Sequence, residues 1–387
     1  MKKVFPLLLL LLTFAGACTP ASAPTEATVA PLPTATPLPA PTATASPQPS
    51  ATPAYPPEGR GPADFPANVN PLTGLEVADP ALLERRPLAI KVENLPRNHR
   101  PQYGLSRADL VYEYYTEEGT TRFIAIFYGQ DADTVGPIRS ARFFDANIVR
   151  AYKAILAFGS ADERVLNRLH SAEFADRLVV EGPNTPLRRL DPNGYNLLVV
   201  DTAALSQYAV GRGIDGGRQD LTGMFFQMTP PEGGQSAASL TVRYSAAIYN
   251  RWDYDPVTGR YLRFADAQND YSGGAGETYE PLLDRATGQQ LAFDNVVVLF
   301  VTHEAYSRTP EMWDILLTGS GRAFACRDGQ VYEVTWQRNA PNAVLSLAYA
   351  DGSPFPFKPG ATWFEVVGLN SEVQPGADGW RFVHQMP

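Results

Sequence analysis

LVYEYY at residues 110–115 and TRFIAIFY at residues 121–128 are two runs rich in β-branched and aromatic residues, and the five residues TEEGT join them. Runs of this composition form strands, and a five-residue connection that contains glycine has the length of a hairpin loop. Apolar residues occupy both alternating sets of positions in the second run, which is typical of a strand covered on both faces. We therefore predict a hairpin whose second strand lies in the middle of a sheet.

Strands and helices alternate around this hairpin. The composition predicts further strands at residues 88–93, 155–158 and 195–200, an exposed basic loop at residues 96–100, and helices at residues 141–154, after Gly159-Ser160, and from the N-cap Asp201 to near Gly211. The helix after Gly159-Ser160 has Asp162 and Glu163 in its first turn, the usual charge arrangement. This order predicts a mixed α/β layer domain, which we assign to residues 68–235.

The pattern changes after a segment that contains glycine, proline and serine, residues 229–239. Runs of strand composition then alternate with glycine-bearing turns, at residues 241–250, 259–264, 296–302, 322–326, 330–338 and 362–367. We predict a mostly β second domain in residues 236–387, built as a small barrel or a sandwich. The fold class is then α+β, with an N-terminal α/β layer domain followed by the β domain, and the chain length also favours two domains.

The first 18 residues have the features of a secretory signal. Lys2 and Lys3 precede a short apolar run, and small residues lead directly to Cys18. The apolar run is too short to span a membrane, and the arrangement is similar to bacterial lipoprotein signals, in which the cysteine is acylated and becomes the mature N-terminus. Cleavage of an ordinary signal peptide near Ala17 is the alternative. We predict an extracytoplasmic protein of the bacterial cell envelope, anchored to the membrane by a lipid on Cys18.

A tract of low complexity, residues 19–67, follows the cysteine. Between Thr19 and Pro57 it has 12 prolines interleaved with threonine, alanine and serine, and Glu26 is the sole charge there. Such a tract cannot form a core and favours extended polyproline II, so we predict a disordered linker. Its composition also permits O-glycosylation.

The chain is acidic, with a formal net charge of −9 that becomes −11 when Lys2 and Lys3 leave with the signal. A moderately acidic protein is not expected to have nucleic acid as its main partner. The four histidines have no paired spacing, and the sequence has no P-loop, GxSxG elbow or dinucleotide fingerprint. We therefore predict no metal and no cofactor.

The corner after the hairpin, VGPIRSAR at residues 135–142, is the centre of the candidate site. Its Gly-Pro pair disfavours helix and Ser140 is a favoured N-cap, so we expect a helix to begin there with Arg142 in its first turn and Arg139 just before it. A helix N-terminus carries partial positive charge and usually has acidic residues beside it. Two arginines at this place therefore need an anion.

That anion has two possible sources. Within the chain, Asp145 is available to pair with Arg142, and Glu93 or Glu113 with Arg139. The alternative is an external phosphate or sulfate, since helix N-termini bind anions readily.

Further charged and polar residues lie inside or at the ends of the strands of the first domain. Glu93 and Asn94 end one strand, Asp109 begins another, Glu113 lies within it and Arg122 begins the central strand. Buried charges without partners are costly, so these residues should pair with one another, with the arginines of the corner or with a ligand. An acid-and-arginine cluster at one end of the sheet fits an oxyanion, and a metal shared by Asp109 and Glu113 is a weaker alternative.

The chain resembles the YerB-like lipoprotein family of bacteria, whose two domains have no known function. The resemblance is carried by NPLTG at residues 70–74, the strands around Asp109 and Arg122, GPIRSAR at residues 136–142, and, in the second domain, Trp252, Thr335-Trp336 and Thr362-Trp363. It departs at GYNLL, residues 194–198, where that family tends to have a histidine. The resemblance implies an envelope lipoprotein and supplies no activity.

A second, weaker similarity is to the LytR-CpsA-Psr phosphotransferases of cell-wall assembly, in which arginines bind a lipid pyrophosphate. The counterparts are Asp109, the strand at residues 121–128, and Pro137 with Arg139. Ser140 stands where that family has an aspartate. This similarity is an analogy, and it suggests an enzymatic alternative.

Our leading hypothesis is a lipid-anchored envelope protein that binds an anionic ligand, such as a phosphate-bearing wall precursor or a glycan. The candidate ligand-binding residues are Arg122, Arg139, Ser140, Arg142, Asp109, Glu113, Glu93 and Asn94. One alternative is a phosphotransferase or hydrolase that uses Asp109 or Glu113 at the same site. Another is a non-catalytic assembly protein that binds an envelope protein, with its arginine cluster paired internally.

Overall fold

The computed structural model describes residues 59–387 except 192–196, 215 and 378, and all of these belong to one compact unit, Thr52–Pro387. The predicted signal with Cys18 and residues 19–58 of the predicted linker lie outside the described residues.

The first described residues correct the end of the predicted linker. The Arg60 N–H donates to the Phe226 carbonyl at 2.6 Å, and the Phe226 N–H donates back to the Arg60 carbonyl at 2.8 Å. The ring of Phe65 packs edge-on against that of Phe226, with 6.3 Å between centroids. Because main-chain pairing and ring packing both begin here, the ordered fold starts before residue 68.

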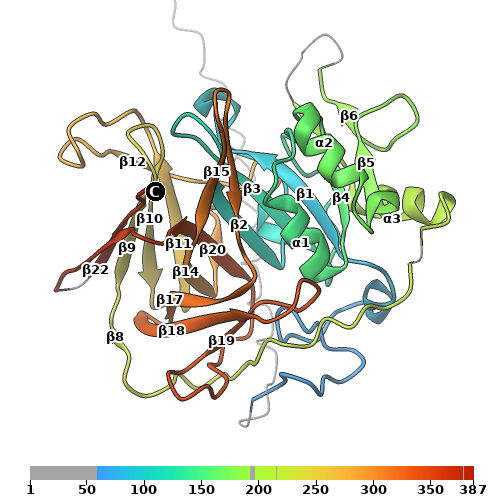
Figure 1. The fold of residues 1–387 in the computed structure, drawn as a ribbon. Helices are drawn as coiled ribbons and strands as arrows, with labels where there is room; N and C mark the ends of the chain where they lie inside the picture. The colour runs from blue at the N-terminus through green and yellow to red at the C-terminus, as the bar shows by residue number, and fades with distance from the viewer. Residues whose placement is uncertain (1–58, 192–196, 215, 378) are drawn as a thin grey trace, which may run out of the picture. The chain divides into compact units, whose positions relative to one another are not determined.

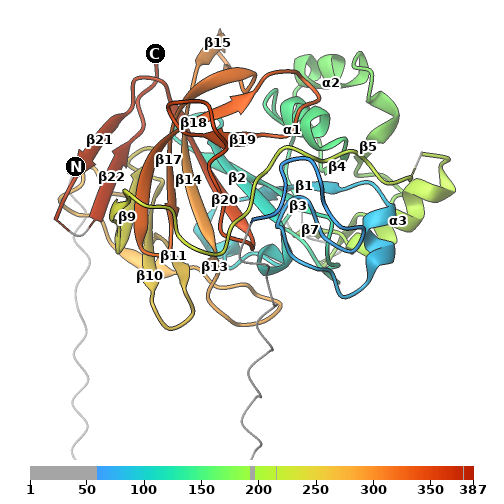
Figure 2. The same cartoon turned by 90° about the horizontal axis from the view of Figure 1, so that it is seen from below.

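One sheet of 11 strands passes through both halves of the described chain (Figure 2). Its order is β19 (Ser346–Ala348), β18 (Gln330–Arg338), β17 (Gly319–Arg327), β14 (Asn295–Val301), β20 (Thr362–Gly368), β2 (Leu110–Tyr115), β3 (Thr121–Phe127), β1 (Leu88–Glu93), β4 (Ile155–Phe158) and β5 (Leu178–Val180), and β8 (Gln235–Ser236) pairs with β18. The two halves meet where β2 pairs with β20 in parallel, with Leu110 opposite Thr362.

A second sheet, of seven strands, packs on one face of the first. Its order is β12 (Tyr279–Pro281), β11 (Arg260–Asp266), β10 (Tyr249–Asp255), β9 (Ser239–Arg243), β22 (Gly379–Val383) and β21 (Glu372–Pro375), and β13 (Ala292–Phe293) pairs with β11. Trp252 of the second sheet and Phe123 of the first both pack edge-on against Trp363. These rings belong to one core between the two sheets.

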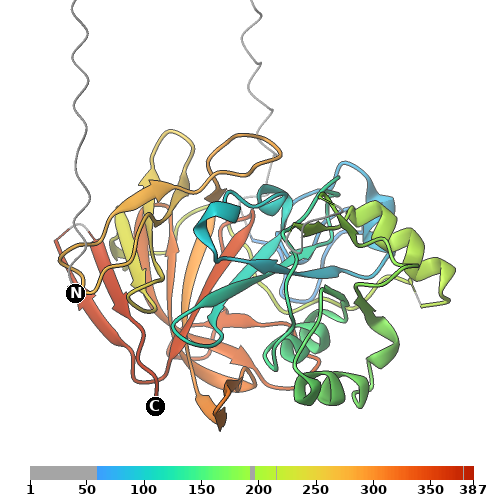
Figure 3. The ribbon, with the colours of Figure 1, turned by 90° about the horizontal axis from the view of Figure 1, so that it is seen from above.

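The helices lie beside β1, β3 and β4, at the end of the large sheet that the first half of the chain forms (Figures 1 and 3). α1 (Asp145–Tyr152) and α2 (Glu163–His170) pack Ile148, Val165 and Leu169 into the core that includes Tyr112 and Ile124. α3 (Thr202–Gly211) packs Leu205 and Ala209 into the core on the opposite face of the same sheet. The large sheet is therefore covered on both faces, which accounts for the continuous apolar runs of its inner strands.

Short elements complete the fold. They are the 3-10 helices Pro80–Glu84, Arg97–His99, Leu105–Arg107 and Ala175–Arg177, the strand pair β6 (Arg188–Arg189) and β7 (Leu198–Val199), and the hairpin of β15 (His303–Arg308) and β16 (Glu311–Ile315). Among the described residues, no helix is both long and apolar enough to cross a lipid bilayer.

The strands of the first half agree closely with the sequence prediction. β1, β2 and β4 have the predicted bounds, β3 ends one residue early at Phe127, and β3 lies between β2 and β1 as expected. α3 follows Asp201, whose carboxylate accepts the Ala204 N–H at 2.9 Å, as predicted. Of the strand predicted at 195–200, residues 195 and 196 lie outside the described residues, β7 pairs with β6, and Val200 pairs with Val135.

The second half of the chain differs from the prediction. Instead of forming a separate barrel or sandwich, β14, β17, β18 and β20 extend the sheet of the first half, and β9 to β13 with β21 and β22 form the second sheet over it. The predicted boundary, between residues 235 and 236, falls inside β8, which pairs with β18. Strand composition predicts strands but not their partners, so the joining of the two halves was not visible in the sequence.

The predicted basic loop at residues 96–100 is not a free surface loop. Arg97 Nε donates to Asp266 Oδ2 at 2.5 Å, and Arg100 Nη1 lies 3.1 Å from the same oxygen. Asp266 ends β11 of the second sheet and is buried. The loop therefore binds the first half of the chain to the second sheet.

Candidate functional site

The helix at the candidate site begins later than the sequence predicts. α1 starts at Asp145 with Phe144 at its N-cap, so Ser140 is not the N-cap and Arg142 is not in the first turn. The Asp145 carboxylate accepts the Arg142 N–H at 2.8 Å, which holds residues 142–145 as a turn ahead of the helix. The acid in the first turn is Asp145, the usual arrangement, and the prediction of a helix with Arg142 in its first turn and Arg139 just before it was wrong.

Arg122 and Arg142 nevertheless meet, and they share one carboxylate. Arg142 Nε donates to Glu117 Oε2 at 2.7 Å and its Nη2 contacts Oε1, while Arg122 Nη2 donates to the same Oε1 at 3.1 Å. Arg122 Nη1 also donates to the Ser140 carbonyl at 2.7 Å. Glu117 comes from the β2–β3 turn, so the hairpin carries both an arginine and its counter-ion.

Arg139 pairs with a different carboxylate. Its Nε lies 2.6 Å from Glu93 Oε2, and His99 Nδ1 lies 2.7 Å from Glu93 Oε1. The pair of Arg139 and Glu93 is one of the internal partnerships that the sequence allowed, and it is confirmed. The other, between the guanidinium of Arg142 and Asp145, is wrong, because Asp145 accepts the Arg142 main chain and Glu117 takes the guanidinium.

The Arg122–Glu117–Arg142 cluster is partly buried, with side chains 18 to 24% exposed. Burial, with Arg142 nearby, lowers the pKa of Arg122 to about 10. Burial opposes the ionisation of Glu117, but hydrogen bonds and charge from Arg142, with the charge of Arg122, lower the pKa of this carboxyl. Two cations thus share one anion in a place where water screens them only in part.

Open space lies on both sides of Glu117. On one side a pocket of about 210 Å³ is lined by Glu117, Ser140, Arg142, Asp162, Pro310, Glu311 and Met312. On the other side a pocket of about 170 Å³ includes Glu117, Glu118 and Arg122. The Ser140 hydroxyl bonds to that of Ser160, at 3.0 Å. Because Glu117 accepts hydrogen bonds from Arg142 Nε and Nη2, an anion that binds these donors competes with Glu117.

Glu113 and Asn94 lie on the other face of the sheet. Arg263 of β11 lies between two glutamates, with Nη2 at 2.5 Å from Glu113 Oε2 and Nη1 at 2.9 Å from Glu365 Oε1. Asn94 donates to Glu113 Oε1 at 3.1 Å. These four side chains are buried between the two sheets, so none of them shares the arginine site.

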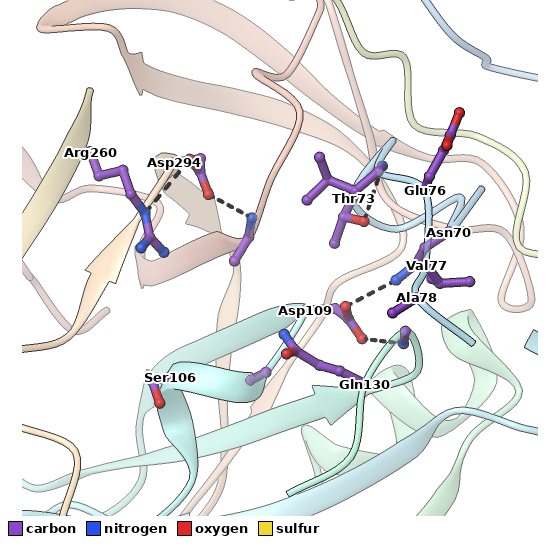
Figure 4. A pocket seen from close by; sticks show the side chains of 14 residues that line it. Asn70, Thr73, Glu76, Val77, Ala78, Ser106, Asp109, Gln130, Arg260 and Asp294 are labelled. Atoms are coloured by element: carbon purple, nitrogen blue, oxygen red, sulfur yellow. Dashed lines mark hydrogen bonds and ion pairs between the residues drawn. The ribbon is translucent and has the colours of Figure 1, made fainter. Parts of the chain in front are cut away.

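Asp109 lies at the opposite end of β2 from Arg122. Its carboxylate accepts Asn70 Nδ2 at 2.9 Å and the N–H groups of Tyr128 and Gly129 at 2.6 and 3.0 Å. Burial raises the pKa of Asp109 to about 6, although those hydrogen bonds oppose the shift. Asp109 lines a pocket of about 270 Å³ whose opposite side carries Arg260 and Asp294 (Figure 4). Asp109, Glu113 and Arg139 thus have different partners, so this arrangement does not bring Asp109 and Glu113 together for a shared metal or Asp109 together with Arg139.

The eight candidate residues therefore divide into separate groups. Arg122, Arg142 and the Ser140 main chain are together, and Arg139 with Glu93 lies next to them on the same face of the sheet. Asp109, and Glu113 with Asn94, belong elsewhere. The sequence prediction missed Glu117 because an acid in a hairpin turn is usually solvated, and the one signal was its position five residues before Arg122. Across the described part of the chain, no three His, Cys, Asp or Glu side chains gather as a metal ion would require.

Comparisons with known proteins agree with this architecture. Residues 72–213 match the family described as "Protein of unknown function (DUF3048) N-terminal domain", and residues 240–364 match its C-terminal domain. The chain belongs to this family.

A similar protein is the Bacillus subtilis (strain 168) protein described as "Putative lipoprotein YerB". The two are 28% identical over 305 residues, which is 77% of this chain and 85% of the relative. The crystal structure of YerB from Bacillus subtilis is also similar, with a TM-score of 0.65 and 26% identity, covering 81% of this chain and 98% of that one. The resemblance inferred from the sequence is confirmed, and the similarity points to an envelope lipoprotein.

Proposed function

We propose that this protein is an extracytoplasmic envelope lipoprotein, anchored by a lipid on Cys18, whose folded part binds an anionic group at the Arg122–Arg142 pair in place of Glu117. The observation that carries the proposal is that two partly exposed guanidiniums share a single carboxylate beside a pocket of about 210 Å³. A phosphate or sulfate offers more oxygens than Glu117 to two forked donors and carries more negative charge.

The ligand class is an anion of the size of a phosphate group, either free or on a wall precursor or glycan. Glu117 already accepts the hydrogen bonds of Arg122 and Arg142. The more firmly the two arginines hold Glu117, the lower the apparent affinity of the protein for an external anion. A weak affinity in the unmodified chain is therefore expected, together with a stronger one when Glu117 no longer competes. Arg139 is not required, since Glu93 holds it separately.

Glu117→Gln tests the proposal directly. The variant keeps the shape of the side chain and removes its charge, so inorganic phosphate is expected to bind about tenfold more tightly, as measured by isothermal titration calorimetry. Arg142→Ala is expected to abolish binding. Arg150→Ala is a matched control, because Arg150 lies on α1 and pairs with Glu173 at the surface.

The second candidate is an assembly protein that binds no anion, in which the arginines serve the fold. It is favoured by the complete internal pairing of Arg139 with Glu93 and of Arg142 with Glu117. In that case phosphate binds neither to the unmodified protein nor to the Glu117→Gln variant.

The enzymatic alternative would need its acids at a different place from the arginines. Glu113 is buried against Arg263, and Asp109 lies at the far end of β2. Turnover of a lipid-linked phosphate that Asp109→Ala removes but Arg142→Ala leaves intact would support this alternative and contradict the proposal.

A further inference from the structure

A buried lysine lies beneath the Arg122–Glu117–Arg142 cluster. Lys91 Nζ is 3.2 Å from Asp145 Oδ1, contacts the Tyr114 hydroxyl and lies 3.9 Å from the centroid of the Tyr114 ring. The side chains of Lys91 and Asp145 are fully buried. Lys91 therefore cannot touch a ligand, and any effect that it has on one must act through charge or through its partners.

Asp145 joins this lysine to the site. One carboxylate oxygen faces Lys91 Nζ at 3.2 Å, and the other accepts the Arg142 N–H at 2.8 Å. The same carboxylate thus fixes the main chain of Arg142 and balances the ammonium. Removing the positive charge of Lys91 leaves Asp145 with a full negative charge close to the arginine pair.

The groups that face Lys91 come from every element packed against it. They are Tyr114 of β2, Arg122 of β3, Glu117 of the β2–β3 turn, Arg142 ahead of α1, and Asp145 of α1. Burial lowers the pKa of Lys91 to about 7; Asp145 opposes this change, and the charges of Arg122 and Arg142 add to it. The ammonium is therefore present below neutral pH and lost above it.

We propose that Lys91 is a positioning residue of the anion site, which through Asp145 sets how strongly the Arg122–Arg142 pair holds an anion, so that binding is stronger below neutral pH than above it. This inference rests on the proposed anion binding. The sign follows from charge, since each proton on Lys91 adds a positive charge within a poorly screened cluster.

The test measures sulfate binding by calorimetry at pH 6 and pH 8 at constant ionic strength. Sulfate is the probe because its charge is constant over this range, whereas phosphate titrates. In the full chain with Glu117→Gln, where no carboxylate competes, sulfate is expected to bind about tenfold more tightly at pH 6 than at pH 8. Adding Lys91→Met is expected to reduce this ratio to about twofold or less.

Two further variants separate charge from structure. Lys91→Met with Asp145→Asn removes both buried charges, so it avoids leaving Asp145 unpaired, and it should also lose the pH dependence. His99→Gln should keep it, because His99 contacts Glu93 and not the pair of Lys91 and Asp145. Lys153→Met removes a lysine at the other end of α1 and should also keep it.

The outcomes distinguish this inference from the function on which it rests. Sulfate binding that is independent of pH, or whose pH dependence survives Lys91→Met, would overturn the role of Lys91 and leave anion binding intact. Failure of sulfate to bind at either pH, with or without Glu117→Gln, would overturn both.

Discussion

Two arginine–carboxylate clusters lie on opposite faces of the β2–β3 hairpin, and they have opposite compositions. On the α1 face, two arginines, Arg122 and Arg142, share Glu117 and are partly exposed. On the other face, Arg263 is shared by Glu113 and Glu365, and all three are fully buried. The first cluster has an excess of positive charge and is partly exposed, whereas the second has an excess of negative charge and is buried.

The two clusters also differ in how their excess charge can be offset. In the buried cluster, burial raises the pKa of Glu113 and the charge of Glu365 adds to this, while Arg263 opposes it. The raised pKa of Glu113 favours its protonated form, which reduces the excess of negative charge. In the partly exposed cluster, arginines do not release protons near neutral pH, so the proposed anion would be what offsets the excess of positive charge. The following predictions test this contrast, from the largest expected effect to the smallest.

Arg263→Met should have the largest effect. It leaves Glu113 and Glu365 together between the two sheets without their shared cation, which is expected to lower the free energy of unfolding by about 3–5 kcal/mol. Urea unfolding followed by circular dichroism measures the change. Arg251→Met, on the neighbouring strand β10, is the control, because Arg251 pairs with Asp253 at a partly exposed site and should cost about 1 kcal/mol or less. Equal losses in the two variants would contradict the contrast.

The pH dependence of stability should follow Glu113. Because its pKa is raised in the folded state, the folded protein holds a proton that the unfolded chain releases at a lower pH. The contribution of Glu113 to stability is therefore full below the ordinary glutamate pKa, about 4.3, and is lost as pH rises through the folded value. Each pKa unit by which folding raises the pKa of Glu113 corresponds to about 1.4 kcal/mol of folding free energy. Unfolding curves at several pH values should show that Glu113→Gln removes this decline in stability. The same decline with pH in the variant as in the wild type would contradict its attribution to Glu113.

Glu117→Gln should have a smaller effect on stability, about 1–2 kcal/mol, since the guanidiniums keep some contact with water and with the Ser140 carbonyl. Added sulfate is expected to restore part of this loss, because it binds the folded state at the place that Glu117 leaves. Added sulfate should not raise the stability of Arg263→Met by more than it raises the stability of the wild type. Rescue of both variants to the same extent would indicate a general salt effect instead of a site.

Arg150→Ala should have the smallest effect. The pair of Arg150 and Glu173 lies at the surface, with side chains 31% and 63% exposed, and such pairs contribute about 0.5 kcal/mol or less. A thermal melt at low and at high salt measures it. A loss comparable to that of Glu117→Gln would show that the partial burial of the Glu117 cluster has no energetic consequence.

The sequence predicted much of the local structure of the first half. Strand composition predicted β1, β2 and β4 with their bounds, and the apolar residues on both faces of β3 predicted its place inside the sheet. These signals are local, because a strand that is covered on both faces must be apolar throughout. The partners of the strands are not local, and nothing in the composition of β20 indicates that it pairs with β2.

The sequence also predicted only the local part of the candidate site. Arg122 lies opposite Tyr114 in the hairpin, so Glu113, one position earlier, points to the other face. Because side chains alternate along every strand, the hairpin pattern in the sequence is sufficient to place Glu113 and Arg122 on different faces. The place of Glu117 depends on how the turn folds over Ser140, and Arg263 comes from a distant strand, so neither was within reach of the sequence pattern.

The parallel pairing of β2 with β20 has a practical consequence for work on this protein. A gene divided at the boundary between the two family segments would yield two products. In the first, the edge of β2 (Leu110–Tyr115) that pairs with β20 would have no partner, and in the second, the edge of β20 (Thr362–Gly368) that pairs with β2 would have none. Unpaired strand edges can form hydrogen bonds with other chains, so each fragment produced alone should aggregate, and each should need the other to be produced in the same cell in order to fold. Co-expression of the two pieces is therefore the appropriate way to ask what either contributes.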